Sequence, residues 1–348
     1  MIKLLFYGRF RLIGTFSLAA LLLLLIVQPV FAQPASGDLC LNRSLEWVIN
    51  SKFIVKNPSD PIYNNPYPPL GGVFLVYDMN KSEFGNRIHI PTAAEYVKLT
   101  AALAQHAHNQ TVMNDLMTVS DFLVAATEQI DFEGDTLATV SPVWVYKDER
   151  GWILLTEEFY TRDALNVALA LLQAYQVTKN EGYASKARAL LNTAVFLQSF
   201  VEKEIQRGDL PDWTSGSLPW ILYKYEQQKN YEVFGALDLS LPDVVWGAFT
   251  LGYNIFGDDR YLKTRDRYFE FVERAYVMTE NTPPYPYQFI DAQSLYFANY
   301  DTIEKEWGSL EPFTTDMAFY QVTGLLMNEN ETYKSLGREF LYNLSLLQ

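Results

Sequence analysis

Residues 161–200 read TRDALNVALALLQAYQVTKNEGYASKARALLNTAVFLQSF, and this stretch predicts two helices folded back on each other. In the first half, apolar residues recur at the i, i+3, i+4 spacing of a buried helical face: Ala164, Val167, Ala168, Leu171, Leu172 and Tyr175. The polar turn 178–182 is rich in residues that form local backbone hydrogen bonds or adopt positive φ. The second half carries its own apolar stripe: Tyr183, Ala187, Leu190, Leu191, Ala194 and Leu197. The stretch therefore predicts a helical hairpin.

The same unit recurs along the chain. Each copy has a polar turn followed by an anchoring residue, and this residue begins the apolar stripe of the second helix. The anchoring residues are Tyr183, Tyr261 and Tyr333, with Val112 in a weaker copy. From Val112 onward these anchors are 71, 78 and 72 residues apart. Hairpins at such a spacing predict a repeat architecture, in which each pair buries its apolar face against the next. We therefore predict an all-α fold, an (α/α) toroid or short α-solenoid, with the toroid domain spanning residues 91–348.

Residues 1–32 have the pattern of an export signal. Three basic residues come first: Lys3, Arg9 and Arg11. An apolar run follows over residues 12–27, and Val30-Phe31-Ala32 provides a cleavage site. We predict an exported protein, periplasmic or extracellular, with no stable membrane span once the signal is removed. An uncleaved anchor is the alternative, because the run is about the minimum length for a span; the folded part lies outside the cytoplasm either way.

Composition narrows the possible functions. Cys40 is the only cysteine, which excludes an intramolecular disulfide and a cysteine-based metal cluster. The net charge of −14 becomes −17 when residues 1–32 are removed, since they hold three basic and no acidic residues. Such a charge argues against a nucleic-acid partner. No Gly-rich phosphate loop, nucleophile elbow or His-Glu-x-x-His signature is present, and we predict neither a cofactor nor a metal.

Residues 33–90 predict an irregular N-terminal arm that packs on the helical body. Prolines and glycine pairs interrupt this region: Pro58, Pro61, Pro66, Pro68, Pro69 and Gly71-Gly72. They are incompatible with long helices. We expect one short helix within residues 45–54 and a strand at residues 73–77.

A β-hairpin is predicted just before the central helix pair. Two apolar, β-prone runs, residues 143–146 and 152–155, flank the polar turn 147–151. Such an insertion would lie at the rim of a toroid's cavity, where Trp144, Tyr146 and Trp152 can stack on a ligand. The alternative is that these aromatic side chains only cover the end of the core.

Four carboxylates occupy equivalent places in the repeat. The first helix of each hairpin carries an acid near its start: Glu95, Asp163, Asp243 and Asp316. If the first helices line the inside of a toroid, these acids share one mouth and can act as general acid and base on a sugar. The alternative is helix capping. Thr92 with Glu95 and Ser240 with Asp243 fit capping boxes, and a first-turn acid is favoured by the helix dipole in any case.

The candidate site draws on these acids and on the polar stretch before the central helix. The catalytic candidates are Glu158, Tyr160, Asp163, Asp243 and Asp316. The candidates for substrate binding are Trp144, Tyr146, Trp152, Arg162, Trp213, Tyr223 and Trp246. Arg162 either clamps a carboxylate of the ligand or pairs with Glu158, four residues earlier.

Residues 91–260 resemble the C-terminal helical domain of D-glucuronyl C5-epimerases, and more loosely the six-hairpin toroids of glycosidases and polysaccharide lyases. The likeness lies in residues 173–180 (QAYQVTKN) with Tyr183 and Ala187, in residues 243–249 (DVVWGAF), and in the aromatic, acidic stretch 223–231. The resemblance implies a toroid and a reaction in which tyrosine and carboxylate groups abstract a proton next to a uronate carboxylate. On that basis the residues implied are Tyr160, Tyr223 and Glu158.

The sequence as a whole predicts an exported protein with a carbohydrate ligand in a toroid cavity. The first hypothesis is an enzyme on poly- or oligosaccharides, of the uronate epimerase, lyase or glycoside hydrolase type. The second is a non-catalytic glycan- or protein-binding module of the cell envelope, in which the acids only cap helices. A scaffold that uses the outer face of the toroid is the third.

Overall fold

The structure is a computed structural model. It describes residues 34–75, 77–78, 83–107, 109–148, 150–155, 158–223, 232–234, 241–281, 290–291, 296–297, 300–301, 306–307, 311–312 and 322–345. The predicted export signal, residues 1–32, lies outside the described residues.

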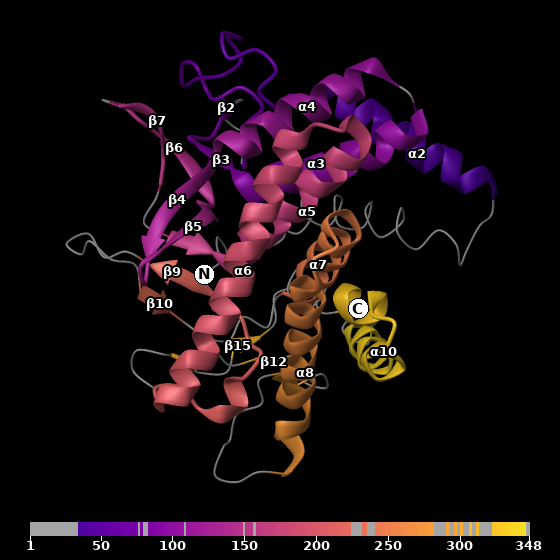
Figure 1. Ribbon diagram of the computed structural model, residues 1–348. Helices are drawn as coiled ribbons and strands as arrows, with labels where there is room; N and C mark the ends of the chain where they lie inside the picture. The colour runs from indigo at the N-terminus through magenta and orange to yellow at the C-terminus, as the bar shows by residue number, and fades with distance from the viewer. Residues whose placement is uncertain are drawn as a thin grey trace, which may run out of the picture.

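Three complete helical hairpins form the body of the protein (Figure 1). They are α3 (Ile90–Ala107) with α4 (Gln110–Ala125), α5 (Thr161–Thr178) with α6 (Glu181–Arg207), and α7 (Pro242–Phe256) with α8 (Asp259–Asn281). The first helices pack side by side in the order α3, α5, α7 and form an inner layer, which α4, α6 and α8 cover as an outer layer. One core of buried apolar residues runs through all three hairpins. This arrangement confirms the predicted all-α class built on the (α/α) toroid pattern.

A fourth hairpin continues the same order. Residues 322–327 are helical, and α10 (Glu331–Ser345) follows them. A Cβ atom on Gly324 would lie 2.1 Å from the carbonyl carbon of Pro242, so the helical segment 322–327 lies directly against the start of α7. The sequence predicts a helix over residues 311–327, but its start is wrong, because Glu311–Pro312 is a strand, β15. Asp316 lies outside the described residues.

The hairpin turns follow from their sequence. Lys179 ends α5 in the left-handed conformation (φ 59°), and its N–H donates to the carbonyl of Tyr175 at 2.8 Å. Asn180 then caps α6, since its side-chain oxygen accepts from the N–H of Gly182 at 2.9 Å. Gly257 repeats the left-handed ending after α7, at φ 67°. The polar turns therefore fix the antiparallel return of each helix pair.

The anchoring tyrosines join neighbouring hairpins. Each is buried and donates its hydroxyl to a polar side chain on the preceding outer helix. The pairs are Tyr183 with Asp121 of α4 (2.8 Å), Tyr261 with Asn192 of α6 (3.1 Å), and Tyr333 with Glu273 of α8 (3.1 Å). Burial, followed by the nearby carboxylate, raises the pKa of both Tyr183 and Tyr333 well above the ordinary tyrosine range. These hydroxyls therefore stay protonated and remain donors.

We expect Tyr261→Phe to lower the free energy of unfolding by about 0.5–1.5 kcal/mol, because one hydrogen bond between α6 and α8 is lost and the ring is kept. Urea denaturation measures the change. Tyr253→Phe is the matched control: Tyr253 lies in α7 of the same hairpin, and its hydroxyl has no hydrogen bond recorded within the described chain. Equal stability of the two variants would contradict a bridging role for the tyrosine.

Small sheets gather at the end of the molecule where the inner helices begin (Figure 1). β6 (Val143–Lys147) pairs with β7 (Gly151–Leu154), which confirms the predicted β-hairpin, and β3 (Arg87–His89) adds a third strand. A second sheet has the order β10 (Glu232–Phe234), β9 (Ile221–Tyr223), β8 (Glu158–Tyr160). The remaining described strands are β1 (Tyr77–Asp78), β2 (Glu83–Phe84), β4 (Thr127–Phe132), β5 (Asp135–Val140), β11 (Ile290–Asp291), β12 (Tyr296–Phe297), β13 (Tyr300–Asp301) and β14 (Glu306–Trp307).

The first hairpin ends earlier than predicted. The sequence predicts the second helix of this hairpin over residues 113–130, but α4 ends at Ala125 and β4 begins at Thr127. In β4 the buried residues Ile130 and Phe132 alternate with exposed ones, and β5 pairs with the whole strand. This period of two is the pattern of a half-buried strand.

The N-terminal arm packs on the first hairpin. It begins with α2 (Pro34–Asn50), which is longer than the predicted short helix, because Pro34 stands at the first helical position, where proline is compatible with a helix. Residues 51–75 are irregular apart from isolated bridges, one joining Ile54 to Val73 and another joining Phe74 to Ile88. Among the described helices, none is long and apolar enough to cross a membrane.

Candidate active site

The inner helices all run in the same direction, so their N-terminal ends meet at one end of the array. We call this region the mouth. It is formed by the first turns of α3, α5 and α7 and by strand β8, which leads directly into α5. The polar side chains that the structure joins across the inner helices are Glu95, Lys98, Arg162, Asn166 and Asp243.

Asn166 joins α5 to α3 at the mouth. Its side-chain N–H donates to Oε1 of Glu95 at 3.0 Å, and its oxygen accepts from Nζ of Lys98 at 2.8 Å. Lys98 also pairs with the same Oε1 of Glu95 at 2.7 Å. The Asn166 side chain is buried, while 24% of the Glu95 side chain is exposed. No bond to Oε2 of Glu95 is recorded among the described residues, so this oxygen is the one that can accept from a ligand.

Arg162 joins α5 to α7. Its two terminal nitrogens donate to the two oxygens of Asp243, each at 3.0 Å, in the bidentate geometry that favours Arg–carboxylate pairs. Both side chains are only about one-sixth exposed, at 16% and 15%. The structure gives Arg162 a partner, Asp243, that neither of its two predicted roles named. Asp243, with both oxygens engaged, is suited to holding Arg162 rather than to proton transfer.

A tyrosine and a carboxylate meet on strand β8. The hydroxyl of Tyr160 donates to Oε2 of Glu158 at 2.9 Å, because residues two positions apart on a strand point to the same face. The ring of Tyr160 makes an edge contact with Trp220, with ring centroids 5.9 Å apart. Across the sheet, Tyr223 of β9 is in register with Glu158. The structure thus brings Glu158, Tyr160 and the backbone of Tyr223 together beside the start of α5.

Asp163 and Glu95 differ in how they relate to the ends of their helices. Asp163 lies in the first turn of α5, where the helix dipole favours a negative charge. Glu95 does not complete a capping box with Thr92, because α3 begins at Ile90 and Thr92 is already inside the helix. The hydroxyl of Thr92 instead contacts Nδ1 of His89 at 2.7 Å. Sequence reasoning recognised Glu95 but missed its partner Lys98, although the i, i+3 spacing was visible.

Several aromatic candidates pack on the core instead of joining the mouth. Trp246 is 9% exposed and lies between Phe269 and the guanidinium of Arg265, whose carbon is 4.2 Å from the ring centre. Trp213, in the short 3-10 helix η1 (Asp212–Thr214), also packs against the core. Trp144 and Trp152 do the same, and Tyr146 contacts Trp152 with ring centroids 5.7 Å apart. The alternative stated for the β-hairpin, that its aromatic side chains cover the core, therefore agrees with the packing of Trp144 and Trp152.

His89 ends strand β3 at the mouth, and burial lowers its pKa from the ordinary 6.5 to about 4. The folded protein therefore keeps His89 neutral, whereas the unfolded chain takes up a proton below pH ~6.5. Its contribution to stability is complete above that pH and is lost as the pH falls towards 4.

We expect this histidine alone to lower the free energy of unfolding by about 2 kcal/mol between pH 7 and pH 5. Denaturant unfolding at a series of pH values tests this, because His89→Gln should flatten the dependence in that window. His106→Gln is the control, since His106 is exposed at the end of α3. An unchanged slope in His89→Gln would contradict the assignment.

Within the described part of the chain, no three histidine, cysteine or acidic side chains are grouped as metal ligands.

Comparisons with known proteins give a likeness of shape only. No protein-family model matches the sequence, and no curated protein matches it. Among solved structures, a family 76 glycoside hydrolase from a bovine Bacteroides thetaiotaomicron strain is 11% identical, with a TM-score of 0.46 over 77% of this chain and 48% of that one. The unsaturated glucuronyl hydrolase of Bacillus sp. GL1 is 13% identical, with a TM-score of 0.46 over 74% of this chain and 62% of that one.

A third similar structure is the endo-β-1,4-glucanase CMCax of Acetobacter xylinum, 12% identical with a TM-score of 0.45, covering 81% of this chain and 71% of that one. The chain spans only about half the length of the family 76 enzyme. All three are named as carbohydrate enzymes. They do not specifically support a resemblance to C5-epimerases. At this identity and TM-score they carry no information about the reaction.

Proposed function

We propose that this protein is an exported carbohydrate-active enzyme that transfers protons to and from a saccharide at the mouth. The observation that carries the proposal is the contact between Tyr160 and Glu158 beside the linked side chains of the inner helices. Partly exposed carboxylates and a tyrosine hydroxyl, held in place by neighbouring helices, are the groups that acid–base catalysis uses. Export rests on the predicted signal in residues 1–32.

The described carboxylates of the mouth have different roles. Glu95 and Glu158 each hold one oxygen in a hydrogen bond and leave the other without a recorded bond in the described chain, so each can accept a proton or a hydroxyl hydrogen bond. Asp243 is committed to Arg162 through both oxygens and positions that side chain. Tyr160 is a hydroxyl donor and supplies the acid. Asp163 and Asp316 stay proposed members of the site.

The reaction that this set supports best is proton abstraction from a sugar carbon next to a uronate carboxylate, as in a lyase or an epimerase. Glu158, Glu95 and Asp243 accept hydrogen bonds or ion pairs from a hydroxyl, an amide, an ammonium and a guanidinium group, so these carboxylates act as acceptors in the mouth. A glycoside hydrolase instead needs one carboxyl group that stays protonated. Lys98 and Arg162 also balance the charges of Glu95 and Asp243, so the joined side chains do not repel an anionic sugar despite the net charge of −14.

Glycoside hydrolysis is the second candidate. Its specific support is Asp163, which lies one residue after Arg162 in the first turn of α5 and adds a further carboxyl group beside the mouth. In that reaction a carboxyl group protonates the glycosidic oxygen, and a carboxylate takes a proton from the water that attacks the anomeric carbon.

A substrate screen with product analysis tests the proposal. The chain from Gln33 is incubated with neutral and with uronate-containing oligosaccharides in deuterated water. A lyase forms a carbon–carbon double bond that absorbs ultraviolet light, an epimerase incorporates deuterium into the uronate, and a hydrolase forms new reducing ends without either. We expect turnover of uronate-containing chains. Binding without any product would favour the non-catalytic glycan-binding module, and the absence of both would favour a scaffold.

A further inference from the structure

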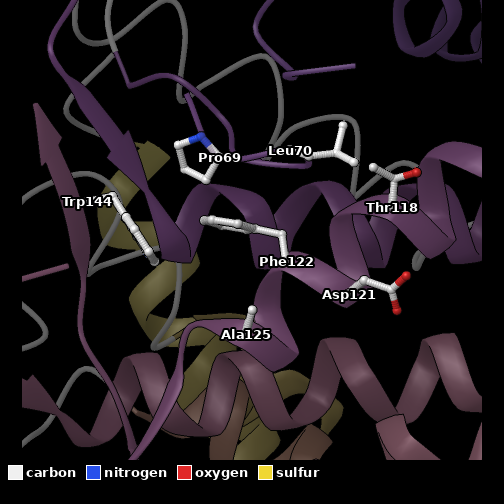
Figure 2. Close-up of a pocket in the computed structure, with 7 residues that line it drawn as sticks. All are labelled: Pro69, Leu70, Thr118, Asp121, Phe122, Ala125 and Trp144. Carbon is white, nitrogen blue, oxygen red and sulfur yellow. The ribbon is translucent and has the colours of Figure 1, made fainter. Parts of the chain in front are cut away.

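A pocket of about 350 Å³ lies on the outer helix α4, and none of its lining residues is among the joined side chains of the mouth (Figure 2). The lining comes from the N-terminal arm, from α4 and from strand β6: Pro69, Leu70, Thr118, Asp121, Phe122, Ala125 and Trp144. Figure 2 shows Trp144 at one end of the pocket and Asp121 at the other, with Phe122 between them. The pocket is at the small end of the range for ligand sites, the size of one sugar residue rather than of a long chain.

The walls of this pocket are held in place by backbone contacts. Gly71 has φ 81°, and a Cβ atom there would lie 2.4 Å from the carbonyl oxygen of Thr118. The arm therefore lies directly on α4, and only glycine allows this approach. Trp144 is in the middle strand of its sheet, paired with Ile88 on one side and Leu154 on the other. The site is thus formed before any ligand arrives.

The two ends of the pocket differ in chemistry. The indole N–H of Trp144 is buried and has no hydrogen bond within the described chain, so the part of this side chain that lines the pocket is its apolar ring. Asp121 is exposed, and its Oδ1 accepts from the hydroxyl of Tyr183 at 2.8 Å. That bond fixes the orientation of the carboxylate, while no bond is recorded for Oδ2. No basic residue is among the lining residues.

We propose that this pocket binds a neutral pyranose residue of the saccharide, at a second site distinct from the mouth; the inference rests on the proposed function. The apolar C–H face of the sugar packs on Trp144, and its hydroxyls donate to Oδ2 of Asp121. A uronate is disfavoured, because its carboxylate would meet Asp121 without a compensating cation. The mouth differs from the pocket because its carboxylates Glu95 and Asp243 are each paired with a cation, Lys98 and Arg162.

The geometry favours a sugar over an organic cation. A cation site surrounds the charge with aromatic faces. Here the rings of Trp144 and Phe122 are 6.5 Å apart and tilted by 47°, and Phe122 is only 4% exposed. The pocket therefore offers one aromatic face and an apolar wall, which matches the two sides of a pyranose ring.

The test follows the resonance of Trp144 in protein labelled with fluorotryptophan. The chain has seven tryptophans, and the spectrum of Trp144→Phe identifies the signal. The probes are a neutral glucose tetrasaccharide, a neutral mannose tetrasaccharide, a glucuronate tetrasaccharide and choline. We expect a saturable shift with a neutral probe and an affinity at least about tenfold lower for the glucuronate probe.

Two variants localise the binding. Ala125→Phe fills the pocket from an exposed position on α4 and should abolish the shift. Asn114→Phe is the matched control, because Asn114 is exposed on the same helix but does not line the pocket, and binding should persist. The inference is overturned if no neutral probe shifts the resonance, if choline alone does so, or if Ala125→Phe binds as tightly as the unaltered protein.

The same samples separate this inference from the proposed function. Turnover of the oligosaccharides without any shift of the Trp144 signal would overturn the pocket and leave the enzyme. A shift that Ala125→Phe removes, in a protein that turns over no saccharide, would support the pocket and overturn the enzyme.

Discussion

Glu158→Gln is expected to lower kcat by about 10²–10⁴-fold on the saccharide that the screen identifies, because the glutamine cannot accept a proton. The change keeps the shape of the side chain, and the amide oxygen can still accept from the hydroxyl of Tyr160, which now donates to Oε2 of Glu158 at 2.9 Å. KM should change little, since the lost interaction belongs to the transition state and not to substrate binding.

Tyr160→Phe separates the two members of this contact. If Tyr160 is the acid, its loss should lower kcat by a similar factor, and the double variant should be little worse than either single one, because residues that act as a unit are not additive. Glu128→Gln is the control: Glu128 lies on β4, outside the mouth contacts, and should keep full turnover. Full activity in Glu158→Gln would remove Glu158 from the mechanism and direct attention to Glu95 and Asp163.

The helical framework was predictable because its signals are local. The apolar stripes of residues 161–200, the polar turns and the anchoring tyrosines specify each hairpin, and the repeat of the unit specifies how the hairpins pack. The tyrosine-to-outer-helix bonds could not be derived in the same way. Tyr261 and Asn192 are 69 residues apart, and only the packing of neighbouring hairpins shows that they meet.

The candidate site was only partly predictable for the same reason. The sequence placed acids at equivalent positions in the repeat, but it could not tell which of their oxygens are occupied. From the sequence, the predicted partner of Arg162 is either a ligand carboxylate or Glu158. In the structure Arg162 pairs with Asp243, which lies 81 residues away. The aromatic candidates were hard to predict for a different reason. The sequence shows that Trp246 is a tryptophan, but it does not show whether the ring is buried or exposed.

Asp115→Asn is expected to lower the free energy of unfolding by about 2–4 kcal/mol, since it leaves a partly buried cation without its counter-ion. The ammonium of Lys56 lies 2.7 Å from Oδ2 of Asp115, and 9% of the Asp115 side chain is exposed. Lys56 also donates to the carbonyls of Val48 and Ile49, the last turn of α2. One interaction therefore holds the arm, α2 and α4 together.

Tyr96 of α3 completes this cluster. Its hydroxyl donates to the same oxygen of Asp115 at 3.0 Å, and burial, followed by the charge of Asp115, raises its pKa above the ordinary range. The asparagine in Asp115→Asn can still accept the hydrogen bond from Tyr96. The loss of stability therefore measures the effect of removing the negative charge of Asp115. The expected loss lies around the low end of the about 3–5 kcal/mol for broken buried pairs and extends below it, because 34% of the Lys56 side chain is exposed.

Urea unfolding with a double-variant cycle gives the measurement. Lys56→Met removes the cation, and Lys56→Met with Asp115→Asn should be less destabilised than the sum of the single variants, because the second change no longer strands a charge. Lys334→Met is the control, since it breaks an exposed pair with Glu331 on α10 and should cost less than about 1 kcal/mol. If Asp115→Asn changes stability no more than Lys334→Met does, the arm is held by apolar packing and the buried charge is incidental. The predicted result instead makes Asp115 the residue that fixes the irregular arm, and with it the pocket wall at Pro69 and Leu70, to the helical body.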